Sequence, residues 1–202
     1  MLYVSHREPL TKVLGPGQRY ALWLQGCKKR CSGCVFPAGQ ALDKGGEWLS
    51  VEKIWQEINA VNNLTGITIS GGEPFLQAQA LAKLVDIVRK NSTLDIMIYS
   101  GYTLDELKSR NDAATNFLLA NIDILIDGEY LEELNTNSIY RGSDNQKIHF
   151  LSPKYLPFKE KILKTKNRSV EFVCRADGEL FMIGVPAKNF NKDFIDKLEA
   201  LK

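Results

Sequence analysis

Three cysteines lie within one short segment, C-K-K-R-C-S-G-C, which contains Cys27, Cys31 and Cys34. Thiolates at this spacing can bind three corners of a cubane iron–sulfur cluster, and such clusters are ordinarily held by four cysteines. The remaining cysteine, Cys174, is far along the chain. The triad therefore predicts a [4Fe-4S] cluster with one iron open to an exchangeable ligand, which indicates chemistry rather than electron storage alone.

Two other uses of the triad stay open on the residues alone. Structural zinc takes four ligands, usually in paired spacings, and the candidates for a fourth ligand (Cys174, His6 and His149) show no such pairing. A disulfide is the other alternative. However, four cysteines in 202 residues, with no apolar leader and no long apolar run, are typical of a cytoplasmic chain with reduced thiols. A cluster- or zinc-binding module without catalysis is thus the alternative to an enzyme.

A second motif, S-G-G-E-P at residues 70–74, follows the β-branched run I-T-I at residues 67–69. That run predicts a buried strand, and paired glycines at its end would let a ligand lie against the backbone because no Cβ blocks the approach. Apolar residues at helical spacing then predict a helix around residues 77–90. The motif therefore predicts a binding turn between a strand and a helix.

Together the two motifs resemble the signature of radical S-adenosylmethionine (SAM) enzymes, C-x-x-x-C-x-x-C followed by G-G-E-P. The resemblance implies that the open iron of the [4Fe-4S] cluster binds SAM. Reduction by an external one-electron donor would then release a 5′-deoxyadenosyl radical, which removes hydrogen from a substrate. It implies cluster ligation by the cysteine triad and no catalytic residue beyond the cluster. It also implies that SAM is bound by Gly33, Val35, Gly71, Gly72, Glu73, Pro74, Ser100 and Asp127.

Further segments are similar to the glycyl-radical enzyme activase branch, and especially to the activating proteins of anaerobic ribonucleotide reductase. They are G-P-G-Q-R at 15–19, Y-S-G-Y-T-L-D-E-L at 99–107, I-D-G-E-Y at 126–130 and R-G-S-D-N-Q at 141–146. The resemblance covers roughly residues 14–150, and the chain departs from it in three ways. Phe36 stands where activases usually have asparagine, Glu129 where they have lysine, and about fifty residues follow the last matching segment. These departures favour a relative with a different client.

Strand and helix patterns alternate along the first 130 residues, which predicts an α/β fold with parallel strands. Strands are expected at residues 20–25, 67–69, 95–99 and 122–126. Helices are expected from residue 51, with Ser50 as N-cap, around 77–90, and after a capping box at Thr103–Glu106. The resemblance implies a partial (β/α)6-type radical SAM barrel. The site motifs follow predicted strands, as expected for such a barrel.

The last fifty residues differ from this pattern. Six Lys or Arg residues against one Glu lie between residues 154 and 168, and this run is either a solvated helix face or a docking surface. Residues 170–175 and 179–183 predict a β-hairpin with a turn at 176–178. We therefore expect a radical SAM core at 1–151. A basic segment, hairpin and terminal helix at 152–202 should pack on this core within a single domain.

Composition and length indicate which classes of partner the chain could bind. With 44% hydrophobic residues and a net charge of +2, the chain suits a compact enzyme and gives no indication of nucleic-acid binding or of a membrane partner. A barrel this short has little chain to enclose a small substrate, which favours a polypeptide client. That client is either a glycyl-radical enzyme or a precursor peptide of natural-product biosynthesis, and the protein is expected in the cytoplasm.

Several single residues have ordinary structural interpretations. His149 is expected on the surface of a strand, His6 near a mobile terminus, and Cys174 as a small thiol in the hairpin. Trp55 is expected in the core stripe of its helix. The basic residues inside the cysteine segment, such as Lys29, are expected to be solvated.

Overall fold

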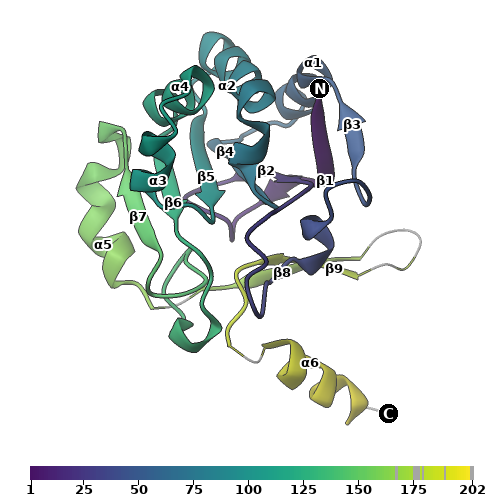
Figure 1. The fold of residues 1–202 in the computed structure, drawn as a ribbon. Helices are drawn as coiled ribbons and strands as arrows, with labels where there is room; N and C mark the ends of the chain where they lie inside the picture. Colours follow the sequence, from purple (N-terminus) through teal and green to yellow (C-terminus); the bar gives the residue numbers. More distant parts are fainter. Residues whose placement is uncertain (167, 175–177, 179, 189, 201–202) are drawn as a thin grey trace.

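The computed structural model describes residues 1–166, 168–174, 178, 180–188 and 190–200. These residues form an α/β fold built on a seven-stranded sheet with the order β3-β1-β2-β4-β5-β6-β7, and a separate two-stranded hairpin, β8-β9 (Figure 1). The predicted α/β class is thus confirmed.

Four neighbouring strands at the centre of the sheet are parallel: β2 (Arg19–Leu24), β4 (Gly66–Gly71), β5 (Asp95–Ser100) and β6 (Ile124–Asp127). They correspond to the four strands predicted from the sequence. Three antiparallel strands flank them: β1 (Leu2–Thr11), β3 (Glu47–Leu49) and β7 (Lys147–Phe150). Because the central strands run the same way, their carboxyl ends meet at one edge, where the site motifs lie.

Helices cover one face of this sheet (Figure 1): α1 (Val51–Asn59), α2 (Ala78–Asn91), α3 (Leu104–Ser109) and α4 (Ala113–Asn121). The predicted start signals are confirmed, because the Ser50 hydroxyl accepts from the Lys53 N–H and Thr103 forms a capping box with Glu106. A 3-10 turn, Pro74–Gln77, precedes α2. Trp55 packs against the core from α1, as expected for its helix stripe.

Strand β2 shows how the sheet separates two apolar layers. Tyr20, Leu22 and Leu24 join the core under the helices, whereas Ala21 and Trp23 point to the opposite face. There they pack with residues of the C-terminal hairpin, formed by β8 (Val170–Cys174) and β9 (Leu180–Gly184). Two central residues of the predicted turn, Ala176 and Asp177, lie outside the described residues.

The segment after β7 is an extension, and its hairpin and Tyr155 pack on the face of the sheet opposite the helices, whereas Phe190 and Phe194 stack on Phe172 of the hairpin. It begins with a 3-10 turn, Pro153–Phe158, and α5 (Lys159–Lys164), and it ends with α6 (Phe190–Glu199). Polar contacts join the hairpin to the core: the Glu171 carboxylate accepts from the Thr11 hydroxyl at 2.6 Å and from the Lys12 N–H at 3.1 Å.

The N-terminal strands β1 and β3 were not predicted. Residues 2–11 include Pro9 and a charged stretch, and such a segment carries no clear strand pattern until it pairs with β2 and β3. Within the part of the chain described, no helix is long and apolar enough to cross a membrane.

Candidate cluster and cofactor site

The cysteine segment forms a loop between the end of β2 and a short 3-10 turn, Pro37–Gln40. Cys27 is buried, Cys31 and Cys34 are half-buried, and none of the three forms a disulfide. In the described residues, no three His, Cys, Asp or Glu side chains gather closely enough to hold a single metal ion.

Backbone and side-chain hydrogen bonds hold this loop in its bent path. The Cys27 N–H donates to the carbonyl of Gln40 at 3.2 Å, and the Arg30 guanidinium donates to the carbonyls of both residues. Gly33 has a φ of 67°, a left-handed conformation that favours glycine. Lys29 directs its N–H to the Cys27 sulfur at 3.4 Å, and such donors influence the potential of a bound cluster.

The loop is also joined to the end of β4. The Glu73 N–H donates to the carbonyl oxygen of Gly26 at 2.8 Å. A Cβ on Gly72 would lie 2.2 Å from that same oxygen, and Gly71 has a φ of 109°. Gly72 is therefore required by the close approach of the cysteine loop, whereas Gly71 is required by its φ and by the backbone of Leu24 on β2, 2.3 Å from where a Cβ would lie. For Gly72 this reason differs from the ligand contact predicted from the sequence.

Glu73 is buried, and its carboxylate is already in use. It accepts from the Ser100 hydroxyl at 3.0 Å, the Gly101 N–H at 2.7 Å and the Phe75 N–H at 3.0 Å. Burial raises the pKa of Glu73 above the usual carboxyl range, while the three donors act in the opposite direction. Glu73 and Ser100 thus connect the ends of β4 and β5 behind the cysteine loop.

Asp127, at the end of β6, is likewise engaged within the protein. Its carboxylate accepts from the Leu104 N–H at the start of α3 and lies 2.9 Å from Nε2 of His149 on β7. His149 is half-buried beside this carboxylate, so its predicted place on a strand surface is only partly right. Asp127 therefore connects β6, β7 and α3.

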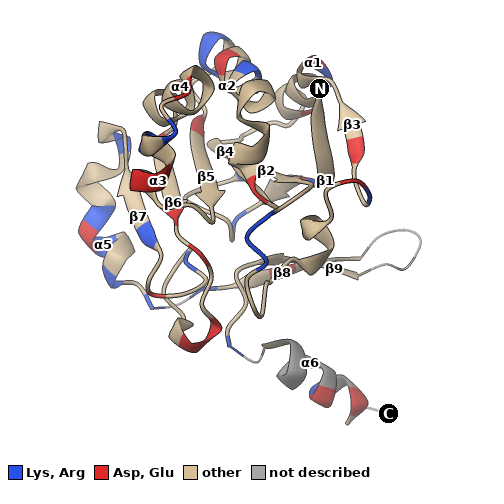
Figure 2. Ribbon diagram, viewed as in Figure 1, with Lys and Arg blue, Asp and Glu red and all other residues tan. Residues whose placement is uncertain are grey.

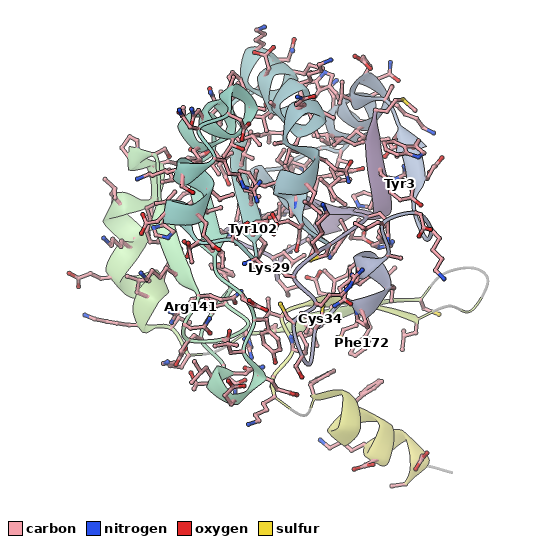
Figure 3. The ribbon with its side chains drawn as sticks, in the orientation of Figure 1. Tyr3, Lys29, Cys34, Tyr102, Arg141 and Phe172 are labelled. Atoms are coloured by element: carbon pink, nitrogen blue, oxygen red, sulfur yellow. The ribbon has the colours of Figure 1, made fainter. Side chains whose placement is uncertain are left out.

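Lys29 was expected to extend into solvent, but its side chain lies against Tyr102 (Figure 3). Its ammonium is 4.5 Å from the centre of the Tyr102 ring and 3.5 Å from the Glu106 carboxylate. Arg110 stacks on the same ring at 4.0 Å. These cation–π contacts join the cysteine loop to the turn after β5.

A cavity of about 280 Å³ opens beside the cysteine loop at the carboxyl edge of the parallel strands. Cys34 and Val35 line it from the loop, and Ser70 and Gly71 line it from β4. The remaining lining residues are apolar, aromatic or uncharged: Leu14, Trp23, Phe36, Tyr99, Tyr130, Gly142, Gln146, Phe181, Met182, Gly184, Val185 and Pro186. Of the described residues around this cavity, none carries a charged side chain.

The predicted site residues are thus divided between the cavity and the wall behind it. Cys34, Val35 and Gly71 line the cavity, and Gly33 adjoins it in the loop. The other predicted residues stabilise the wall: Gly72, Glu73, Pro74, Ser100 and Asp127. Four lining residues were not predicted although they lie within the motif segments: Ser70, Tyr99, Tyr130 and Gln146. Their place in these segments could have identified them from the sequence.

Other residues singled out from the sequence lie outside the cavity. His6 lies within β1, with its ring 3.7 Å from that of Phe181, so the expectation of a mobile end was wrong. Cys174 is exposed in β8. In the basic run, Lys166 donates to the Ser138 hydroxyl and Arg168 donates to the carbonyl of Arg141, so these two cations hold the extension to the core.

Of the remaining basic residues, Lys159, Lys161 and Lys164 lie on α5, beside β7 (Figure 2), and Lys154 lies in the 3-10 turn before it. There Lys164 pairs with Glu160 at 3.3 Å, and both side chains are largely exposed. Such a pair contributes little to stability.

The residues present fit an iron–sulfur cluster with a small bound cofactor. Three free thiols share one held loop, an N–H points at the Cys27 sulfur, and an uncharged cavity begins at Cys34. Burial, with Glu129 nearby, raises the pKa of the Cys31 thiol, and binding to iron would favour its thiolate.

Comparison with known proteins gives concordant results. Residues 13–149 match a family described as "4Fe-4S single cluster domain". The anaerobic ribonucleoside-triphosphate reductase-activating protein of Escherichia coli K12 is 34% identical over 151 residues, which cover 71% of this chain and 95% of that protein. Its counterpart from Vibrio cholerae is 33% identical over 149 residues, which cover 70% and 93%. A putative glycyl-radical enzyme activating enzyme of Haemophilus influenzae is 29% identical over 113 residues, which cover 54% and 43%.

Proposed function

Because the chain belongs to the 4Fe-4S single-cluster family, we propose that it is a radical SAM enzyme that removes hydrogen from a polypeptide client, as an activase does. The main support for this proposal is the contact between the cysteine loop and the turn after β4. The Glu73 N–H holds the carbonyl of Gly26, one residue before the first cysteine, and the cavity begins at the last cysteine.

Cys27, Cys31 and Cys34 would hold the cluster, and SAM would lie in the adjoining cavity. With both bound, the site supplies reductive cleavage of the SAM sulfonium and a 5′-deoxyadenosyl radical that takes a hydrogen atom from the client. The protein's own residues position these groups. Val35 and Gly71 line the space, while Glu73 and Ser100 hold the ends of β4 and β5 in place.

We interpret the parallel strands with their flanking strands as a partial (β/α)6-type radical SAM barrel, with residues 1–151 as its core. Sites of such barrels lie at the carboxyl ends of the strands, where the motifs lie in this chain. An external one-electron donor has to reach the cluster, and the cysteine loop offers it exposed residues, such as Lys28.

The client is inferred to be a protein, on two grounds. The relatives are named as activating proteins of a reductase and of glycyl-radical enzymes. The cavity beside Cys34 holds about 280 Å³, which is just below the range of roughly 300–1,000 Å³ typical of small-molecule pockets. It therefore suits one bound cofactor, with the client segment presented at its rim.

A cluster assay tests the first half of the proposal. Anaerobic reconstitution should give four irons and four sulfides per chain, and alanine at any one of Cys27, Cys31 or Cys34 should prevent stable assembly. Cys174→Ala is the matched control, because that thiol is exposed at the end of β8 and is not part of the cysteine loop. Full loss of iron in the control, or zinc in place of iron, would refute the assignment.

A transfer assay tests the second half. With a strong reductant, the reconstituted protein should cleave SAM slowly to methionine and 5′-deoxyadenosine. A glycyl-radical enzyme encoded beside it, deuterated at its glycines, should pass deuterium into the 5′-deoxyadenosine. Deuterium transfer from a neighbouring precursor peptide alone would instead support the peptide-modifying alternative, and turnover of a free small molecule would contradict both.

A further inference from the structure

The C-terminal hairpin contributes to a site that its position in the sequence does not suggest. The family match ends at residue 149, yet β9 and the two residues after it supply Phe181, Met182, Gly184, Val185 and Pro186 to the lining of the cavity beside Cys34. In Figure 1 the hairpin lies across the sheet from the helices. The extension thus forms part of the same space as the motifs of the core.

We propose that the extension completes the SAM pocket of this protein, with Met182 and Val185 in contact with the bound cofactor. The inference rests on the proposed function, since it concerns the cofactor of that same site. It assigns a binding role to residues outside the matched segment.

The chemistry of the cavity supports this assignment. Five aromatic rings line it, and none of its described lining residues is charged: the rings are Trp23, Phe36, Tyr99, Tyr130 and Phe181. Aromatic faces attract cations such as a sulfonium, and they stack with flat bases such as adenine. SAM carries both groups. A charged client side chain would instead lose its hydration in this space without a partner.

The size of the cavity points to contact with β9. At about 280 Å³, the space is slightly smaller than typical ligand pockets, so a cofactor that begins at Cys34 fills most of it. Met182 and Val185 are among the residues that line it. A cofactor of that size therefore meets the wall that these residues form.

The wall is held in place by the core. Ile183 is fully buried and Val185 is 8% exposed, and both pack with Trp23 and Leu14. The amide of Asn135 also lies 3.4 Å from the carbonyl of Pro186. The hairpin wall of the cavity is thus packed against the core.

Phe36 and the C-terminal extension, two of the departures from the activase pattern, are in contact with one another. This residue stands where activases usually carry asparagine, and its ring packs in the same cluster as Ile183 and Val185. An asparagine there would place an amide against the apolar hairpin, which costs free energy when the amide lacks a partner. An aromatic residue at position 36 is thus compatible with the apolar surface of the extension, whereas an asparagine would not be.

The test measures SAM affinity directly. Equilibrium dialysis with radiolabelled SAM on the unreduced, cluster-loaded protein gives a dissociation constant without turnover. Met182→Lys should weaken binding at least tenfold, because it places a cation in an uncharged cavity beside a sulfonium. Met182→Ala should weaken binding about threefold, and Met182→Leu should bind as the wild type does, because it keeps the apolar contact. Leu180→Lys is the matched control, since Leu180 lies on the same strand, is 51% exposed and does not line the cavity.

The outcomes separate the two proposals. If the wild type binds no SAM while its cluster is intact, the proposed function fails. If the wild type binds SAM and both Met182→Lys and Met182→Ala stay within twofold of it, the inference about the extension fails. Should Met182→Lys not fold, as judged by circular dichroism and iron content, the comparison of Met182→Ala with Met182→Leu decides the question.

Discussion

The backbone N–H of Glu73 donates a hydrogen bond to the carbonyl oxygen of Gly26, over a distance of 2.8 Å. Gly26 immediately precedes the first cysteine of the triad, and Glu73 lies in the turn after β4. This single bond joins two motifs that are separated by about forty residues in the sequence, so a disturbance of the turn should be felt at the cysteines.

Gly72→Ala should therefore impair cluster assembly. The added Cβ would lie 2.2 Å from the oxygen of Gly26 and 2.6 Å from that of Gly39, so the cysteine loop has to shift. We expect destabilisation of about 1–3 kcal/mol, as in other overpacked sites, and a clear drop in iron per chain after reconstitution. The control is Gly101→Ala, whose nearest new contact is the flexible Lys29 side chain at 3.1 Å. Equal iron content in both variants would contradict the prediction.

Ser100→Ala should reduce stability but spare the cluster. It removes one donor from the buried Glu73 carboxylate, which typically costs about 1–3 kcal/mol. Iron content should stay near that of the wild type, because the bond to the cysteine loop uses the backbone of Glu73. Urea unfolding and iron analysis measure the two effects. Ser109→Ala, at an exposed helix end, should change stability by less than about 0.5 kcal/mol.

Asp95→Asn should be strongly destabilising without a direct effect on the site. Asp95 and Arg19 are both fully buried and lie 2.6 Å apart at the amino ends of β5 and β2, away from the cysteine loop. Loss of one partner leaves a buried charge unpaired, which costs about 3–5 kcal/mol. Thermal or urea unfolding checks this value.

The control for that variant is Asp86→Asn, which breaks an exposed pair with Lys90 on α2. Surface pairs of this kind contribute about 0–1 kcal/mol. A similar loss of stability in both variants would show that burial of the Arg19–Asp95 pair has no special effect.

Asp144 should contribute to stability in mild acid. The hydroxyls of Ser138 and Thr136 lower its pKa from the ordinary 3.8 to about 2. Because the folded state holds the lower pKa, this contribution is fully present above the unfolded value and disappears as pH falls towards 2.

Asp144→Asn should accordingly flatten the fall in urea midpoint between about pH 5 and pH 2. Midpoints measured at half-unit pH intervals for both proteins test this expectation. Curves that remain parallel throughout would mean that the hydroxyl contacts do not hold the carboxylate ionised.

The site motifs could be predicted from the sequence because they depend on interactions between residues close together in the chain. The spacing of Cys27, Cys31 and Cys34 is set within one loop, and the strands before each motif are short apolar runs whose pattern needs no tertiary context. Ser50 and Thr103 likewise cap the helices that immediately follow them. The order of the parallel strands then places their carboxyl ends together, as the alternation of strands and helices predicts.

The tertiary structure decided what each motif residue touches. Whether a Cβ at Gly72 meets a ligand or the Gly26 carbonyl depends on how β2 and β4 align, and pattern alone does not contain that register. The same holds for β9. Nothing in the run from Leu180 to Gly184 indicates a cavity, because its place beside Cys34 arises from packing against Trp23 and Leu14, more than 150 residues away along the chain. Contacts over such separations follow from the shape of the whole sheet, so only the folded chain determines them.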